Sequence, residues 1–199
     1  MKLATFALAT ALSVPGIAGA ATFSGSFNLS GSAFSDPGLV IQVAPNPGNF
    51  TFDLDVGQST TVDLFDIWTN EGSLQNDDLA SSSIAAAFNF TNPLTSGNLS
   101  GTSFGSVNWL WLLQTQTGNV DWNNPLNLTF GSGGLLSITL NDADFNKGYY
   151  KLNPGRNNGA TISATFTYSA APVPLPAAVW LFGSALFGVA GIGYRRKPA

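Results

Sequence analysis

The sequence predicts an all-β protein whose central body, residues 21–170, forms an antiparallel β-sandwich. Three observations lead to this prediction. Apolar and polar residues alternate with a period of two, as expected of strands that bury one face. Clusters rich in Gly, Pro and Asn, such as 45–48 and 131–134, separate short apolar runs. Many short strands without intervening helices favour a sandwich over a parallel α/β sheet.

The expected strands, in chain order, are 22–29, 39–44, 50–56, 61–68, 83–90, 107–114, 126–130, 135–140 and 160–168. The alternation is clearest in 50–56, where Phe50, Phe52 and Leu54 are separated by polar residues. In 61–68 the alternation changes phase at Phe65, which predicts a β-bulge at that point. Helices are expected only at the two ends of the chain.

Residues 1–20 contain the parts of a secretory signal peptide in their usual order. Lys2 supplies the positive start, and residues 3–14 form an apolar segment that Pro15 ends. Ala18 and Ala20 satisfy the small-x-small rule of signal peptidase, so we expect cleavage after Ala20. The alternative is an ordinary buried N-terminal helix.

Residues 171–199 form a separate C-terminal tail. The stretch 177–194 is apolar and uncharged, and as a helix it would be about 27 Å long. This is close to the length needed to span a bilayer. The basic residues Arg195, Arg196 and Lys197 follow it and predict a cytoplasmic end. We therefore expect a transmembrane helix that leaves the body outside the inner membrane.

A short proline motif precedes this apolar stretch. It consists of Val173, Pro174, Leu175, Pro176 and Ala177. Together with the span and the basic end, it resembles the PEP-CTERM class of sorting tails in its VPLPA form, with Leu175 where the better-known form has Glu. The likeness covers 173–197 of the 199 residues. It implies a Gram-negative host and an exosortase that cleaves near the motif and passes the body to the cell surface or extracellular matrix. A single-pass anchor that is never cleaved is the alternative.

The charge and composition of the body exclude several classes of function. Residues 21–172 carry 11 acidic and 3 basic side chains, a net charge of 3 − 11 = −8, which opposes binding to nucleic acid. The chain has no His and no Cys. It therefore lacks disulfides, thiolate nucleophiles, imidazole bases and the usual zinc ligands.

Acidic residues supply two candidate sites. Asp142, Asp144 and Asn146 form the D-x-D-x-N start of a calcium loop. The Gly then comes one position late and the expected Glu is missing, so an Asx-rich turn is the favoured interpretation and no cofactor is expected. A looser calcium site, built from these oxygens or from Asp77 and Asp78, is the alternative. The pairs Asp53/Asp55 and Asp63/Asp66 suggest the two carboxylates of a glycosidase. Their alternation with apolar residues indicates a solvated face, so we expect no catalysis.

Three tryptophans, Trp109, Trp111 and Trp122, lie within fourteen residues. On one strand, Trp109 and Trp111 would share a face. Exposed, they would stack on sugars, but leucines occupy the other face, so burial in the core is the favoured interpretation. Two functions remain: a non-catalytic surface or matrix protein, and a carbohydrate-binding module that attaches to exopolysaccharide.

Overall fold

The structure, a computed structural model, describes residues 20–131 and 133–170. Four of the predicted features lie wholly or partly outside these residues: the signal peptide up to residue 19, with Ala18; the proline motif Val173, Pro174, Leu175, Pro176 and Ala177; the apolar stretch; and the basic end Arg195, Arg196 and Lys197. Within the two described ranges, no helix has the length and apolar character that crossing a membrane requires.

The described residues form eleven strands and three short 3₁₀ helices. The strands are β1 (Ala21–Ser30), β2 (Ile41–Ala44), β3 (Gly48–Leu54), β4 (Ser59–Thr69), β5 (Ser82–Asn92), β6 (Leu94–Leu110), β7 (Leu113–Trp122), β8 (Leu126–Phe130), β9 (Gly134–Leu140), β10 (Ala143–Tyr149) and β11 (Ala160–Ala170). The 3₁₀ helices are η1 (Ser32–Phe34), η2 (Asp77–Leu79) and η3 (Arg156–Asn158).

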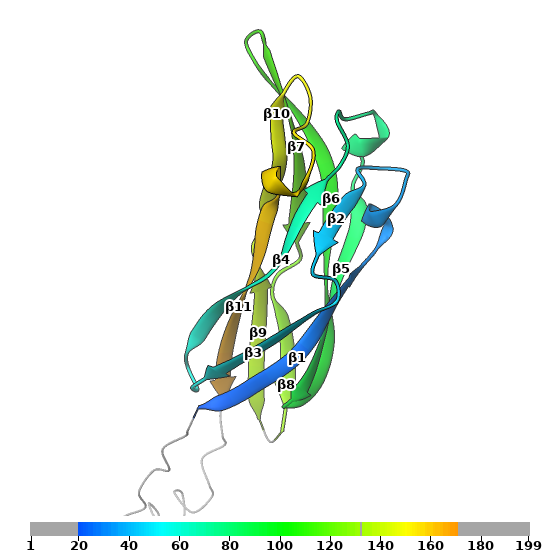
Figure 1. Cartoon of the computed structure of the whole chain (residues 1–199). Coiled ribbons are helices and arrows are strands. Elements are labelled where there is room, and N and C mark those ends of the chain that lie inside the picture. Colours follow the sequence, from blue (N-terminus) through cyan, green and yellow to red (C-terminus); the bar gives the residue numbers. More distant parts are fainter. Residues whose placement is uncertain (1–19, 132, 171–199) are drawn as a thin grey trace, which may run out of the picture.

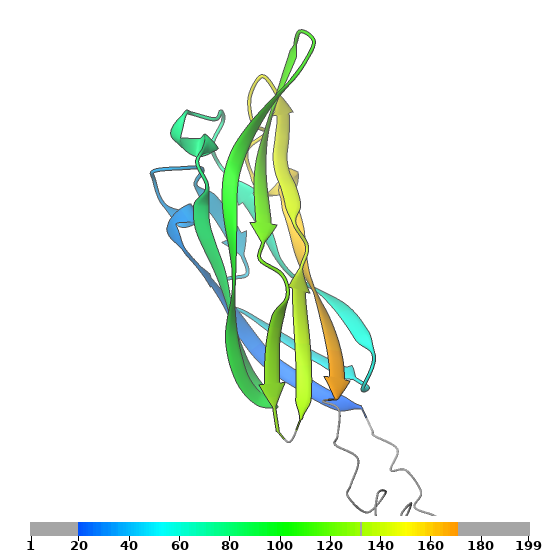
Figure 2. The same cartoon turned by 180° about the vertical axis from the view of Figure 1, so that it is seen from behind.

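Two curled sheets contain these strands (Figures 1 and 2). The six-stranded sheet has the order β10-β7-β6-β5-β1-β3, and the five-stranded sheet has the order β2-β4-β11-β9-β8. All of the strand pairs are antiparallel. The prediction of an all-β, antiparallel body is therefore confirmed.

The period-two pattern explains why one face of each strand is buried. In β3, Phe50, Phe52 and Leu54 are buried while the residues between them are exposed. In β4, the pairing with β11 shifts register so that Leu64 is the extra residue beside Phe65, and both side chains are buried. The bulge predicted from the change of phase is thus confirmed.

Aromatic rings join the two sheets across the core. Phe166 of β11 is fully buried and lies 4.4 Å from Phe52 and 5.5 Å from Phe50 between ring centroids. Phe23 of β1 packs edge-to-face against Tyr168 of β11. These contacts hold the six-stranded sheet against the five-stranded one, because large aromatic side chains bury much apolar surface in a small number of contacts.

The predicted strand 107–114 is wrong. Leu110 pairs with Leu113, so Trp111 and Leu112 form the turn of a β6–β7 hairpin instead of continuing one strand. Most of β6, most of β7 and all of β10 were not predicted. Gly, Ser, Asn and Thr dominate β6, and polar residues interrupt the apolar alternation of β7 and β10.

The elongated body has two distinct ends. The start of β1 and the end of β11 lie at the same end of the body (Figure 1). The β6–β7 hairpin projects beyond the other strands at the opposite end, as both views show. The fold therefore places this hairpin at the opposite end of the body from the start of β1 and the end of β11.

Candidate functional site at the projecting hairpin

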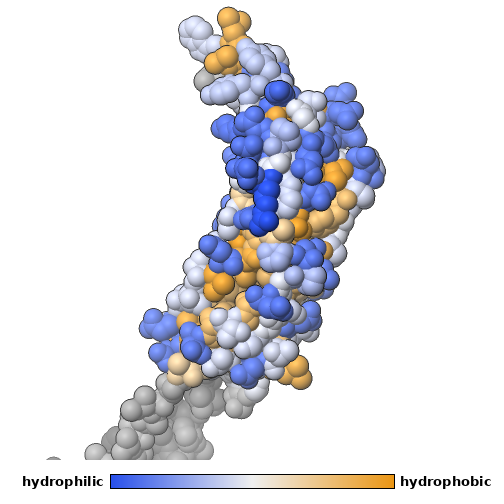
Figure 3. All heavy atoms as spheres, viewed as in Figure 1, coloured by the Kyte–Doolittle hydropathy of each residue, from blue (hydrophilic) through white to orange (hydrophobic). Residues whose placement is uncertain are grey.

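The free end of the β6–β7 hairpin carries four exposed apolar side chains. We call these residues, Trp109, Trp111, Leu112 and Leu113, the apex. Trp111 is 95% exposed, Leu112 86% and Trp109 69%. Figure 3 shows apolar residues at this end of the molecule, directly above a hydrophilic part of the surface; further apolar residues lie in the middle of the same face. Exposed apolar patches on soluble proteins commonly mark interaction sites. This finding overturns the interpretation that Trp109 and Trp111 belong to the core.

The turn also separates the two tryptophans. Trp109 lies on β6 opposite Gln114, whereas Trp111 is the first residue of the two-residue turn and has φ 57°. A positive φ is costly for a bulky side chain, and Gly is the usual residue at the equivalent position of a type II′ hairpin. The predicted sharing of one strand face by Trp109 and Trp111 is therefore wrong.

Tyr150 braces the hairpin from the end of β10. Its hydroxyl donates a hydrogen bond to the carbonyl oxygen of Leu112 (2.8 Å), and its backbone N–H donates to the carbonyl of Gln114 (2.8 Å). Tyr150 itself has φ 61°, so the chain turns sharply after β10 to place it there. The apex is thus fixed to the body at two points beyond the strand ladder.

A buried asparagine fixes the segment that carries Tyr150. Asn146 is fully buried with φ 53°, and its Oδ1 accepts a hydrogen bond from the Thr69 N–H (2.8 Å). Its Nδ2 donates to the carbonyls of Asn153 and Gly155. One side chain therefore ties β10 to the end of β4 and to the loop before η3.

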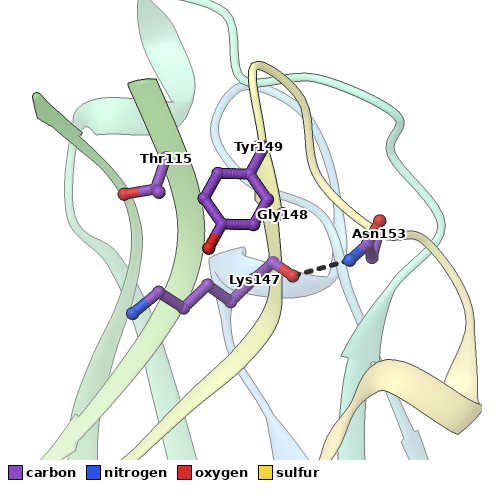
Figure 4. Close-up of a pocket in the computed structure, with 5 residues that line it drawn as sticks. All are labelled: Thr115, Lys147, Gly148, Tyr149 and Asn153. Carbon is purple, nitrogen blue, oxygen red and sulfur yellow. Dashed lines mark hydrogen bonds between the residues drawn. The ribbon is translucent and has the colours of Figure 1, made fainter. Parts of the chain in front are cut away.

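A surface pocket of about 240 Å³ lies beside this brace (Figure 4). It is lined by Thr115 of β7 and by Lys147, Gly148, Tyr149 and Asn153. The Asn153 Nδ2 donates to the Lys147 carbonyl (2.7 Å), which orders the loop at its edge. The Tyr149 ring is 68% exposed. The pocket thus combines an aromatic face with a hydroxyl, an amide and an ammonium group.

Trp122 does not belong to this site. It is buried, and its ring lies 6.5 Å edge-to-face from Phe65 of the opposite sheet. Its backbone N–H donates to Asp142 Oδ1 (2.7 Å). Stacking of Trp122 on a glycan is therefore incompatible with its position, and the three tryptophans do not form one platform.

The calcium candidates do not converge either. Asp142 and Asp144 are exposed, whereas the Asn146 side chain points into the body and both of its polar atoms are hydrogen-bonded. Within residues 20–131 and 133–170, no group of three acidic, His or Cys side chains is placed to hold a metal ion. The D-x-D-x-N pattern instead reflects a strand whose Asn closes a polar network.

The carboxylates considered for catalysis bind neighbouring side chains on the outside of the strands. Asp53 accepts a hydrogen bond from Thr22 and Asp63 accepts one from Ser163, both at 2.6 Å. Asp66 forms an ion pair with Arg156 (2.7 Å), and this contact, with a hydrogen bond from Thr161, holds the pKa of Asp66 below its ordinary value. None of these carboxylates lines the pocket beside Tyr149.

Glu71 gives a prediction for the pH dependence of stability. Burial raises the pKa of Glu71, and the charge of Asp78 adds to this effect, although the Val40 N–H donates to its Oε1 (2.8 Å). A raised carboxyl pKa means that the folded state binds the proton more tightly, so stability falls as pH rises through the folded pKa. Glu71→Gln keeps the acceptor and removes the charge. We expect it to stabilise the protein at neutral pH by at most about 0.5 kcal/mol, because solvent screens the site.

The measurement is the midpoint of thermal unfolding for the wild type and Glu71→Gln at neutral pH and near pH 4, around the ordinary Glu pKa. The difference between them should close at the lower pH. Asp55→Asn, on the exposed surface, is the control for loss of one negative charge. A Glu71→Gln variant that is less stable at neutral pH would contradict the expectation.

Sequence reasoning missed Leu112, Leu113, Tyr149 and Tyr150 at the apex and its brace, and Thr115 and Lys147 at the pocket. The signal that could have found the first two is the uninterrupted apolar run at 109–113, which is too short for a buried helix and lacks the polar alternation of a half-buried strand. The adjacent tyrosines at 149 and 150 show no such pattern. In comparisons with protein-family models, curated proteins and solved structures, no match to this chain was found.

Proposed function

We propose that the protein is a non-catalytic, exported cell-surface or extracellular-matrix protein whose tail is a sorting signal. The main support for this proposal is the arrangement of the body. Both described chain ends lie at one end and the exposed apex lies at the other (Figure 1). A body attached through residue 170 would therefore present the apex outward.

In this proposal signal peptidase removes residues 1–20, and the apolar stretch holds the precursor in the inner membrane. An exosortase then cleaves near the proline motif, and the body, a β-sandwich, passes to the surface of a Gram-negative cell. The body needs no cofactor for this role. The aromatic core between the two sheets suits a structural domain, and no step of the proposal requires a catalytic group.

The test compares the full chain with a form that lacks residues 171–199, both expressed in a Gram-negative host that has an exosortase. We expect the full chain to lose mass at both ends and to reach the surface or matrix. The shortened form should lose only its N-terminal segment and should not be retained at the surface. A shortened form that reaches the surface as the full chain does would contradict the sorting role.

A second function, attachment to exopolysaccharide, is supported by the pocket beside Tyr149. Sugars bind to exposed aromatic faces that have hydrogen-bonding groups alongside, and the pocket supplies Thr115 and Asn153 for this purpose. Calorimetry with a broad panel of glycans that gives no heat would exclude this function.

A further inference from the structure

The apex of the β6–β7 hairpin has the properties of a membrane-inserting tip. Its four exposed side chains belong to an apolar run in the sequence, 109–113, and the hairpin that carries them projects farthest from the other strands (Figure 1). The surface there is convex, because it is the free end of a two-residue turn. We propose that the apex inserts into the surface of a lipid bilayer. The proposal does not depend on the sorting role of the tail.

Part of the backbone at the apex is already hydrogen-bonded within the protein. The ladder between β6 and β7 continues through Asn108–Thr115 and Trp109–Gln114 to Leu110–Leu113. The Leu112 carbonyl, which the turn would leave without a partner, accepts a hydrogen bond from the Tyr150 hydroxyl. Unpaired backbone groups are expensive in hydrocarbon, so the Leu110–Leu113 pairing and the bond from Tyr150 both lower the cost of moving the turn into it.

The residues behind the apex suit the polar side of a bilayer. Tyr149 pairs with Thr115, three residues after Leu112, and both Tyr149 and Tyr150 are more than half exposed. Trp and Tyr side chains prefer the membrane interface, where one part of the ring is dry and the other is wet. The two lysines of the body, Lys147 and Lys151, flank these tyrosines and are exposed. In an otherwise acidic body, they supply attraction to anionic headgroups.

Two other occupants fit the apex less well. Two tryptophans and two leucines offer roughly 600 Å² of side-chain surface at most. A stable contact with a second copy of the chain needs about 800 Å² from each partner. A polysaccharide needs several hydrogen-bonding side chains beside the aromatic rings, and the run 109–113 offers only the indole N–H donors of its two tryptophans. Binding to lipid explains why Leu112 and Leu113 are exposed, whereas binding to sugar does not.

The absence of Cys from the chain allows a site-specific probe in the full-length protein. Leu112→Cys places an environment-sensitive fluorophore at the apex. Leu94→Cys is the matched control, because Leu94 is also 86% exposed but lies at the start of β6, where it pairs with Thr91 at the end of the body opposite the apex (Figure 1). The full chain is held in phosphatidylcholine nanodiscs, so that its apolar tail is already accommodated. Acceptor vesicles of phosphatidylcholine and phosphatidylglycerol carry a lipid-borne quencher.

We expect the Leu112 probe to shift to shorter wavelength and to be quenched by the acceptor vesicles, while the Leu94 probe does not change. Trp111→Gly, in a chain that carries the Leu112 probe, should weaken vesicle binding roughly tenfold or more through loss of buried apolar surface. Gly accepts the positive φ at position 111, so this variant should keep its fold. Circular dichroism checks that it does.

Three results would overturn the proposal. The first is an unquenched Leu112 probe at every lipid composition. The second is equal quenching of the Leu112 and Leu94 probes, which would show that the contact is not made by the apex. The third is a Leu112 probe that responds to dextran or alginate and not to vesicles, which would assign the apex to polysaccharide.

Discussion

Phe166→Ala is expected to destabilise the body by about 3–5 kcal/mol, the usual cost of removing a buried phenylalanine ring. Phe166 is fully buried in β11, and its ring centroid lies 4.4 Å from that of Phe52 and 6.4 Å from those of Phe88 and Phe90. All three neighbours belong to the opposite sheet. Alanine would leave a cavity at the point where the two sheets meet, and the surrounding rings are held by their own strands and can close it only in part.

Thermal unfolding followed by near-ultraviolet circular dichroism measures this effect. For a domain of this size, a loss of 4 kcal/mol lowers the midpoint by roughly 10 °C. Phe166→Leu retains apolar volume and should cost less than half as much. Leu94→Ala, at an exposed position, should change the free energy of unfolding by less than about 0.5 kcal/mol. A Phe166→Ala variant that unfolds within a degree of the wild type would contradict the packing described.

The strands that the sequence predicted correctly are those with strong apolar alternation. In β3, the apolar residues Phe50, Phe52 and Leu54 are buried and the polar residues between them are exposed. Burial therefore alternates with the same period of two as the sequence. The bulge in β4 was predictable for the same reason, because an extra residue must change the phase of a buried face. Apolar periodicity in a sequence reflects burial, so it predicts a strand correctly where alternate residues of that strand are buried.

The hairpin was not predicted because its apolar residues are exposed. A run such as 109–113 is most often part of a core, and the sequence alone provides no sign that it projects beyond the other strands. The turn also lacks the Asn, Asp or Gly that usually marks a two-residue connection, since Trp111 and Leu112 occupy it. The hairpin lacks the usual turn residues and exposes four large apolar side chains. Such departures from local sequence rules are found mainly at functional or strained sites.

Pairing across the sheet brought together residues that are distant in sequence. Leu112 and Tyr150 are joined by a hydrogen bond although 38 residues separate them. No local pattern links the two positions. The pocket beside Tyr149 arises in the same way, from Thr115 of β7 and the β10 segment that pairs with it. The candidate site thus depends on strand order, which composition and spacing do not determine.

Asn146→Ala is the second change expected to have a large effect, with a loss of about 3 kcal/mol or more. It removes the acceptor of the Thr69 N–H and the donor to the carbonyls of Asn153 and Gly155. A buried polar group left without a partner costs about 1–3 kcal/mol. Alanine is also unfavourable at φ 53°, by roughly 1 kcal/mol.

A series of variants separates these two costs. Asn146→Gly loses the same hydrogen bonds but accepts the positive φ, so it should recover roughly 1 kcal/mol relative to Asn146→Ala. Asn157→Ala, in the exposed η3 segment, is the matched control and should be close to wild type. Urea unfolding gives the free energies, and equal values for Asn146→Ala and Asn157→Ala would contradict the role of the network.

The same variant tests whether the network also supports the apex. Asn146 fixes the segment from which Tyr150 reaches the Leu112 carbonyl, so loosening it should speed amide exchange at the hairpin turn more than in β3, on the far edge of the same sheet. Uniform acceleration across the sheet would show that Asn146 contributes only to global stability. Acceleration confined to β10 and the hairpin turn would show that a buried amide positions the exposed tip, which connects the core to the candidate interaction surface.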